Sequence, residues 1–133
     1  MDGLAYILDD LSGIWSPVEW ASKAISSYRI RNADRVIGEA NNGGDLIETV
    51  IRGVDPSVAY SKVWASRGKI TRAEPVAAIY EQGRVRHVGI FGDLETEMTT
   101  WAGQKGEKSP NRVDALVWAL TELLISKSNV AVA

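Results

Sequence analysis

Residues 34–51 read DRVIGEANNGGDLIETVI, and three features of an α/β domain follow one another within them. Residues 34–39, with Val36 and Ile37 at their centre, are expected to form a strand, and residues 41–44 form a loop of asparagine and glycine, which tolerate tight turns. After Asp45, which we expect to cap a helix, apolar residues recur at helical spacing: Leu46, Ile47, Val50 and Ile51. A strand, a glycine loop and a helix in this order predict an α/β fold.

The same alternation continues on both sides of this stretch. We expect further strands over residues 4–8, 58–65 and 85–88, and further helices over residues 16–31, 71–82, 94–101 and about 110–124. No repeat or linker interrupts the series, so we expect a single domain over residues 1–133 with a largely parallel sheet. The tail from Ser126 is expected to fray.

Two of the helices have start signals in the sequence. Ser16-Pro17-Val18-Glu19 supplies a cap, a proline for the first turn and an acid three residues after the cap. Ser109-Pro110 provides a similar start for the last helix. Its expected buried face consists of Val113, Leu116, Val117, Leu120, Leu123 and Leu124.

Composition excludes several classes of protein. The chain has 133 residues, 45% of them hydrophobic and 24% charged, as in one soluble globular domain. It has no cysteine and one histidine, which excludes disulfides, thiol catalysis and zinc sites built from cysteine or several histidines. The longest apolar run, residues 115–120, is too short to span a membrane, and the start of the chain has no leader, so we expect a cytoplasmic protein. The net charge of −2 leaves nucleic-acid binding to local basic clusters.

Common nucleotide and hydrolase motifs are also missing. Gly68-Lys69 is followed by Ile70, so there is no phosphate-binding P-loop, and no G-x-G-x-x-G opens a helix. The G-x-S-x-G turn of serine hydrolases is absent as well. His87, in an apolar strand, is expected to be a packed side chain rather than a base or ligand.

Two carboxylates are the candidate catalytic and metal-binding residues. Glu39 ends a strand, where open α/β sheets place their ligands, and Asp114 lies in the first turn of the last helix. Carboxylates brought together repel one another and bind Mg²⁺ or Mn²⁺, which can promote phosphodiester hydrolysis. The structural alternative is that Glu39 is a surface acid and that Asp114 only stabilises the helix dipole.

Three cations lie where the third strand leads into its helix. Arg67, Lys69 and Arg72 can face phosphate there together with the N–H groups of the helix, and the alternative is a solvated loop. We also expect Asn42, in the loop after Glu39, to contact DNA.

Several stretches together resemble the carboxy-terminal nuclease domain of the large terminase subunit of tailed phages. In chain order these stretches are Glu39 with NGGD at 42–45, ASRGK at 65–69, RAEPVAAIYEQGRV at 72–85, LETEM at 94–98 and SPNRVDALVWALTEL at 109–123. The resemblance as a whole runs in order from about Leu4 to Leu124. The resemblance implies an RNase H-like fold, with a mixed or parallel sheet flanked by helices. It implies a metal-dependent endonuclease that cuts concatemeric viral DNA during genome packaging.

The resemblance also implies residue roles and partners. Glu39 matches the second acidic metal ligand and Asp114 the late acid at the start of the final helix, whereas Asn111 stands where relatives often have another acid. The implied cofactor is Mg²⁺ or Mn²⁺. The implied partners are double-stranded DNA, an ATPase motor domain, and a portal protein or small terminase subunit.

The chain departs from the family at its front. The first acid of the family lies in a strand that precedes what begins here at Leu4, and Asp9 and Asp10 do not match it. We therefore expect an N-terminally truncated domain with weak metal affinity and little or no cleavage on its own. Without the first two strands of the family, the strand at residues 34–39 would keep an unpaired edge. We therefore expect either that the chain's own first strand pairs with Val36-Ile37 or that strands pair between chains of a homo-oligomer.

Two other functions are compatible with the sequence. One is a non-catalytic prophage remnant that binds DNA or a partner protein. The other is a small-ligand binding domain at Asn42-Gly43-Gly44, which would need a closed apolar pocket.

Overall fold

The computed structural model describes residues 3–40, 46–103, 107 and 110–125, and the chain divides into two compact units. Unit 1 takes the residues up to Asp10 and those from Arg67 onward, and unit 2 is Leu11–Ser66. Each unit has its own hydrophobic core and is described by itself. A single domain over residues 1–133 stays a prediction, and the tail from Ser126 lies outside the described residues.

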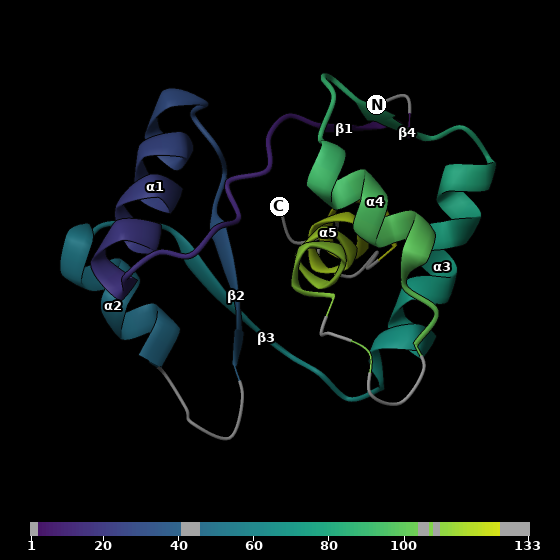
Figure 1. The fold of residues 1–133 in the computed structure, drawn as a ribbon. Coiled ribbons are helices and arrows are strands. Elements are labelled where there is room, and N and C mark those ends of the chain that lie inside the picture. Colours follow the sequence, from purple (N-terminus) through teal and green to yellow (C-terminus); the bar gives the residue numbers. More distant parts are fainter. Residues whose placement is uncertain (1–2, 41–45, 104–106, 108–109, 126–133) are drawn as a thin grey trace. The chain divides into compact units, whose positions relative to one another are not determined.

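Strands and helices alternate along the chain, which confirms the α/β class (Figure 1). In order the elements are β1 (Ala5–Ile7), α1 (Pro17–Ile30), β2 (Val36–Ala40), α2 (Leu46–Val54), β3 (Tyr60–Trp64), α3 (Lys69–Glu81), β4 (Val85–His87), α4 (Gly92–Thr100), α5 (Asn111–Leu120) and the π-helical η1 (Thr121–Ile125). None of the helices in the described part of the chain is long and apolar enough to cross a bilayer.

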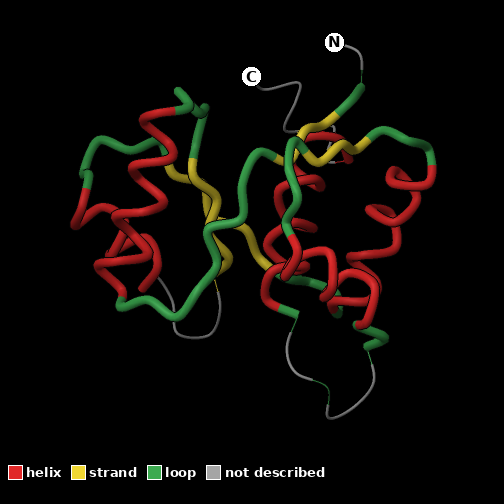
Figure 2. The backbone as a smooth tube through the Cα atoms, turned by 45° about the horizontal axis from the view of Figure 1, so that its top comes forward, coloured by secondary structure: helices red, strands yellow, loops and turns green. Residues whose placement is uncertain are grey.

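Unit 2 consists of a parallel strand pair covered on one face by two helices. β2 and β3 pair from Val36 opposite Tyr60 to Ala40 opposite Trp64, and Figures 1 and 2 show α1 and α2 on one side of them. The core between these layers consists of Ala21, Ile25, Ile51 and Val58, with Val36 and Tyr60 among the side chains packed on it.

The predicted start of α1 is confirmed. The Ser16 side chain accepts a hydrogen bond from the Glu19 backbone N–H at 3.3 Å, and the Glu19 carboxylate accepts one from the Ser16 N–H at 2.9 Å. Pro17 follows the cap, where its missing N–H costs nothing. Two backbone N–H groups at the N-terminal end of α1 thus have partners that the helix itself cannot supply, so the helix begins at Pro17 directly after the Ser16 cap.

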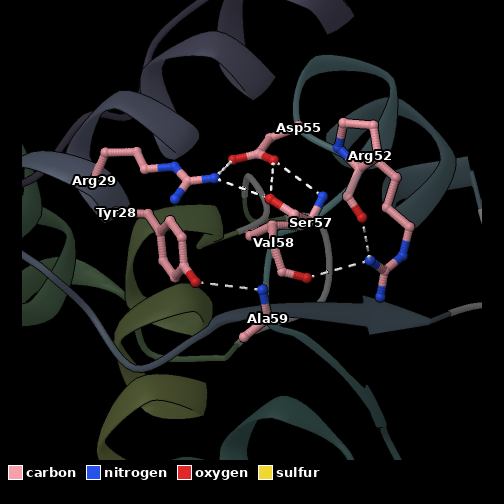
Figure 3. Close-up of polar contacts among 8 residues, drawn as sticks. Tyr28, Arg29, Arg52, Asp55, Ser57, Val58 and Ala59 are labelled. Carbon is pink, nitrogen blue, oxygen red and sulfur yellow. Dashed lines mark hydrogen bonds and ion pairs between the residues drawn. The ribbon is translucent and has the colours of Figure 1, made fainter.

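The turn between α2 and β3 is fixed by polar contacts (Figure 3). The Asp55 carboxylate pairs with the Arg29 guanidinium and accepts hydrogen bonds from the N–H and hydroxyl of Ser57. Arg52, near the end of α2, donates to the carbonyl groups of Pro56 and Val58 at 3.3 and 3.2 Å. Arg29 lies in the last turn of α1 and Arg52 in the last turn of α2, so these contacts join the ends of both helices to the segment that leads into β3.

In unit 1 the helices α3, α4, α5 and η1 and a short parallel strand pair pack around a second core. β1 pairs with β4 over three residues, from Ala5 opposite Val85 to Ile7 opposite His87. The core consists of Ala5, Val76, Ile79, Leu94, Val113, Leu116, Val117 and Leu120.

Among the described residues β1 pairs with β4 within unit 1, and β2 pairs with β3 within unit 2. The expected pairing of the first strand with Val36-Ile37 would join the two units and stays a prediction. Two expectations need correction. The third helix begins at Lys69 instead of residue 71, because Gly68 has the extended backbone of an N-cap and the helical backbone follows directly after it. Leu123 is 58% exposed, because the wider π-helical turn that begins at Thr121 rotates it off the buried face of α5.

Candidate functional site

Asp114 lies in the first turn of α5, as the sequence predicts. Its backbone N–H donates to the Pro110 carbonyl at 2.8 Å, which is the first hydrogen bond of the helix. A carboxylate at this end is favoured by the helix dipole. Val113 before it and Leu116 two residues after it are buried in the unit 1 core, and the Asp114 side chain is only 12% exposed.

Both oxygens of Asp114 contact cations of α3. The Arg72 guanidinium donates to Oδ1 at 2.7 Å, and the Lys69 ammonium lies 3.3 Å from Oδ2. The carboxylate is therefore neutralised from two sides within unit 1.

Arg72 is held by more than its ion pair. Its Nε donates to the carbonyl of Arg67 at 3.1 Å, and its guanidinium carbon lies 4.7 Å from the ring centroid of Trp118. Stacking on an indole ring is typical of arginine, whose guanidinium is planar and weakly hydrated. Its side chain is 12% exposed, so Arg72 occupies a fixed position between α3 and α5.

As arranged, the surroundings of Asp114 do not fit a divalent metal. A metal–carboxylate bond of about 2 Å would require one of the two cations to leave, because both would otherwise repel the metal. Across residues 3–40, 46–103, 107 and 110–125, no group of three or more histidine, cysteine, aspartate or glutamate side chains could hold a metal ion.

Glu39 lies in unit 2, at the fourth position of β2. Its neighbours Gly38 and Ala40 are buried toward the helices, so by the alternation of a strand Glu39 points to the opposite face, where it is partly exposed. Because Glu39 and Asp114 belong to different units, their binding of one cation stays a prediction.

The predicted DNA-contacting residues fall into three groups. Lys69 and Arg72 lie against Asp114, whereas the Arg67 side chain is exposed just before α3. Asn42 lies outside the described residues. Contact of these residues with DNA stays a prediction.

His87 is a packed side chain, as expected. Its Nε2 lies 2.8 Å from the Tyr80 hydroxyl and its Nδ1 lies 2.9 Å from the Glu95 carboxylate, so the ring joins α3, β4 and α4. Hydrogen bonds from His87 and from the Phe91 N–H lower the pKa of Glu95. Burial, and secondarily the Glu95 charge, raise the pKa of Tyr80 to about 12.

Two further contacts position the start of α5. The Glu97 carboxylate of α4 accepts a hydrogen bond from the Val113 N–H at 2.8 Å, and Arg112 donates to the Asp10 carboxylate at 3.1 Å. Asp10 is thus part of an ion pair that ties the segment after β1 to α5. Sequence reasoning missed this pair and the Arg72–Asp114 pair because their partners are 102 and 42 positions apart.

Comparison with protein families gives one match over most of the chain. The family described as terminase RNaseH-like domain matches residues 6–123, which include Glu39, Asp114 and all three described cations. Comparisons with curated proteins and with solved structures gave no match.

Proposed function

The chain belongs to the family of terminase RNase H-like domains, and on that basis we propose that it acts on double-stranded DNA as the nuclease-type domain of a phage terminase. The proposed reaction is divalent-metal-dependent endonucleolytic cleavage of concatemeric viral DNA during genome packaging. The single observation that carries the proposal is the family match over residues 6–123. The α/β architecture, with its small parallel strand pairs flanked by helices, is consistent with an RNase H-like domain.

In this proposal Glu39 and Asp114 are the acidic residues of the catalytic site, with Mg²⁺ or Mn²⁺ as the cofactor. The cofactor would supply an activated water and stabilise the charge that develops on the phosphodiester. Arg67, Lys69, Arg72 and Asn42 would hold the DNA backbone. Since backbone contacts do not depend on base sequence, we expect nonspecific binding that weakens steeply with salt.

The contacts of Asp114 support weak activity of the chain by itself. Both carboxylate oxygens are engaged by Lys69 and Arg72, so a metal has to compete with two cations already in place. We propose that full activity depends on the wider terminase: an ATPase motor domain, a portal protein or small terminase subunit, and further copies of this chain in a homo-oligomer. The proposed setting is the cytoplasm of a bacterial host.

A non-catalytic role is the second candidate, and the same contacts favour it. A carboxylate neutralised by two cations serves to join α3 to α5 even where no metal binds. In this case the chain would be a prophage remnant that binds DNA or a partner protein.

Duplex binding and cleavage in the presence of Mn²⁺ test the proposal and separate the two candidates. We expect duplex binding that falls with salt, and slow cleavage that is lost in both Glu39→Ala and Asp114→Ala. Binding without any cleavage favours the remnant. Absence of duplex binding, or strong cleavage that survives both substitutions, contradicts the proposed nuclease.

A further inference from the structure

A cavity of about 310 Å³ lies in unit 1 between α4 and the start of α5. Residues of α4 spaced three and four apart form one wall, because such residues share a face of a helix. The wall residues of α4 are Asp93, Thr96, Glu97 and Thr100, and Trp101 directly after the helix and Arg112 of α5 also line the cavity. Sites for small ligands in proteins span about 300–1,000 Å³, so this cavity has room for a small group.

The described lining carries more negative than positive charge. Its carboxylates are those of Asp93, Glu97 and Glu107, and its one guanidinium is that of Arg112. Two carboxylates already share the charge of Arg112, because its Nε donates to Asp10 at 3.1 Å and its Nη2 lies 3.7 Å from Asp93. Arg112 therefore does not neutralise the rest of the lining.

Glu97 is the carboxylate of this wall that lacks a counter-charge. It is partly buried, and its Oε1 accepts a hydrogen bond from the Val113 N–H at 2.8 Å. A backbone N–H carries no net charge, so this contact fixes the carboxylate in place without neutralising it. Across the described part of the chain, no lysine or arginine forms an ion pair with Glu97. A cation that enters the cavity would supply the missing charge.

Trp101 adds an aromatic residue to the same wall. It is partly buried against the unit 1 core and also lines the cavity. An indole attracts a cation through its ring face, and it also packs well against aliphatic carbon. Lysine-like groups combine these two properties, because they carry their charge on an apolar stem. An indole beside an uncompensated carboxylate therefore fits an organic cation.

From this geometry we propose that the cavity binds an alkylammonium group, with its charge on Glu97 and its aliphatic stem against Trp101. Free polyamines and the lysine side chains of proteins both present such a group. Neither Glu39 nor Asp114 lines the cavity, so the site goes beyond the proposed nuclease function and does not depend on DNA cleavage.

NMR titration of the whole chain tests the site, with the indole N–H signals as the measured quantity. The chain has five tryptophans, and Trp101→Phe identifies the signal of the one in the cavity. The probes are spermidine and a tripeptide with a central lysine, blocked at both ends. The same tripeptide with glutamine in place of lysine is the neutral control.

We expect a saturable shift of the Trp101 signal with an ammonium probe and none with the neutral tripeptide. Tighter binding of spermidine would identify a polyamine as the source of the group, and tighter binding of the lysine tripeptide would identify a protein. Absence of a shift with both ammonium probes, or an equal shift with the neutral tripeptide, would overturn the proposal.

Two threonines of α4 provide a matched pair of variants. Thr96 lines the cavity, whereas Thr99 does not. Thr96→Lys would bring an ammonium of the chain itself to the cavity, so we expect it to weaken binding of the ammonium probes about fivefold. Thr99→Lys adds the same charge to the helix and is expected to change binding by less than about twofold. Equal weakening in both variants would show a general effect of charge and would overturn the proposal.

The counter-charge itself is tested at Glu97. Glu97→Gln removes the charge but keeps an oxygen that can accept the Val113 N–H, and we expect about fivefold weaker binding of the ammonium probes. Glu74→Gln, at an exposed glutamate of α3, is expected to leave binding unchanged. Unshifted signals of the other four tryptophans show that each variant is folded. Full binding in a folded Glu97→Gln chain would overturn the proposal.

Discussion

The Arg72 guanidinium lies 4.7 Å from the ring centroid of Trp118, one helical turn after Asp114 on α5. Residues four apart on a helix lie on the same face, so one arginine of α3 contacts both the carboxylate and the indole. The pairing of α3 with α5 in unit 1 therefore combines a charged contact and an aromatic one.

Loss of the arginine should destabilise unit 1. Arg72→Met would leave Asp114, which is only 12% exposed, with Lys69 as its remaining described cation. We expect the free energy of unfolding to fall by about 1–3 kcal/mol in urea titrations. Arg67→Met, which removes an exposed charge, should change it by no more than about 0.5 kcal/mol. Equal effects of the two substitutions would contradict the structural role of Arg72.

Two glycines should respond to alanine with opposite signs. A Cβ on Gly38 would lie 1.8 Å from the Tyr60 hydroxyl and 3.1 Å from Ile47, so Gly38→Ala is expected to cost about 1–3 kcal/mol. A Cβ on Gly53, within α2, would meet nothing within 4 Å, and Gly53→Ala should stabilise the helix by about 0.5–1 kcal/mol. Thermal melts of both variants measure the difference, and a stabilising Gly38→Ala would contradict the packing of β2 against α2.

Replacement by alanine should cost much more stability at Leu120, the last residue of α5, than at Leu123. Leu120 is fully buried in the unit 1 core, so Leu120→Ala should cost about 2–5 kcal/mol. Leu123, three residues later, is 58% exposed and should tolerate alanine at a cost below about 1 kcal/mol. A large loss at Leu123 would show that α5 continues as a regular helix beyond Thr121.

The raised pKa of Tyr80 predicts a loss of stability at high pH. Its folded value of about 12 exceeds the ordinary value of 10, because burial and the nearby Glu95 charge disfavour the phenolate. The stabilisation that the neutral Tyr80 phenol gives the folded state is complete below pH 10. It is lost as the pH rises toward 12, because the unfolded chain releases this proton at a lower pH than the folded chain. Melting temperatures between these pH values should therefore fall less in Tyr80→Phe than in the unsubstituted chain. Tyr6→Phe, at an exposed tyrosine, serves as the control. If the melting temperature of Tyr80→Phe fell with pH as steeply as that of the unsubstituted chain, the raised pKa of Tyr80 would be contradicted.

Local signals in the sequence predicted much of the fold. The capping box at Ser16 and Glu19 fixes the start of α1 through contacts three residues apart, and apolar spacing predicted the buried face of α5 up to Leu120. The match over residues 6–123 confirms the family. Leu123 was assigned to the wrong face because the spacing rule assumes an α-helix, and a π-helical turn advances each residue by a smaller angle.

The contacts of the candidate site were less predictable. Sequence placed Asp114 at a helix start and Lys69 and Arg72 near another, but their contact joins residues 42 positions apart and depends on how α3 packs against α5. Two of the three cations expected to contact DNA, Lys69 and Arg72, are partners of the expected metal ligand Asp114. No local pattern distinguishes these two roles, because a phosphate and a carboxylate attract the same side chains.

Iron-directed cleavage of the polypeptide tests most directly the proposal that Glu39 and Asp114 bind one cation. Fe²⁺ in place of Mg²⁺, with ascorbate and peroxide, generates hydroxyl radicals that cut the chain close to the metal. With a short duplex present, we expect cuts near both residue 39 and residue 114, and we expect both to disappear together in Glu39→Gln and in Asp114→Asn. Cuts near only one of these positions, or cuts near both that respond separately to the two substitutions, would show that the carboxylates do not share a cation.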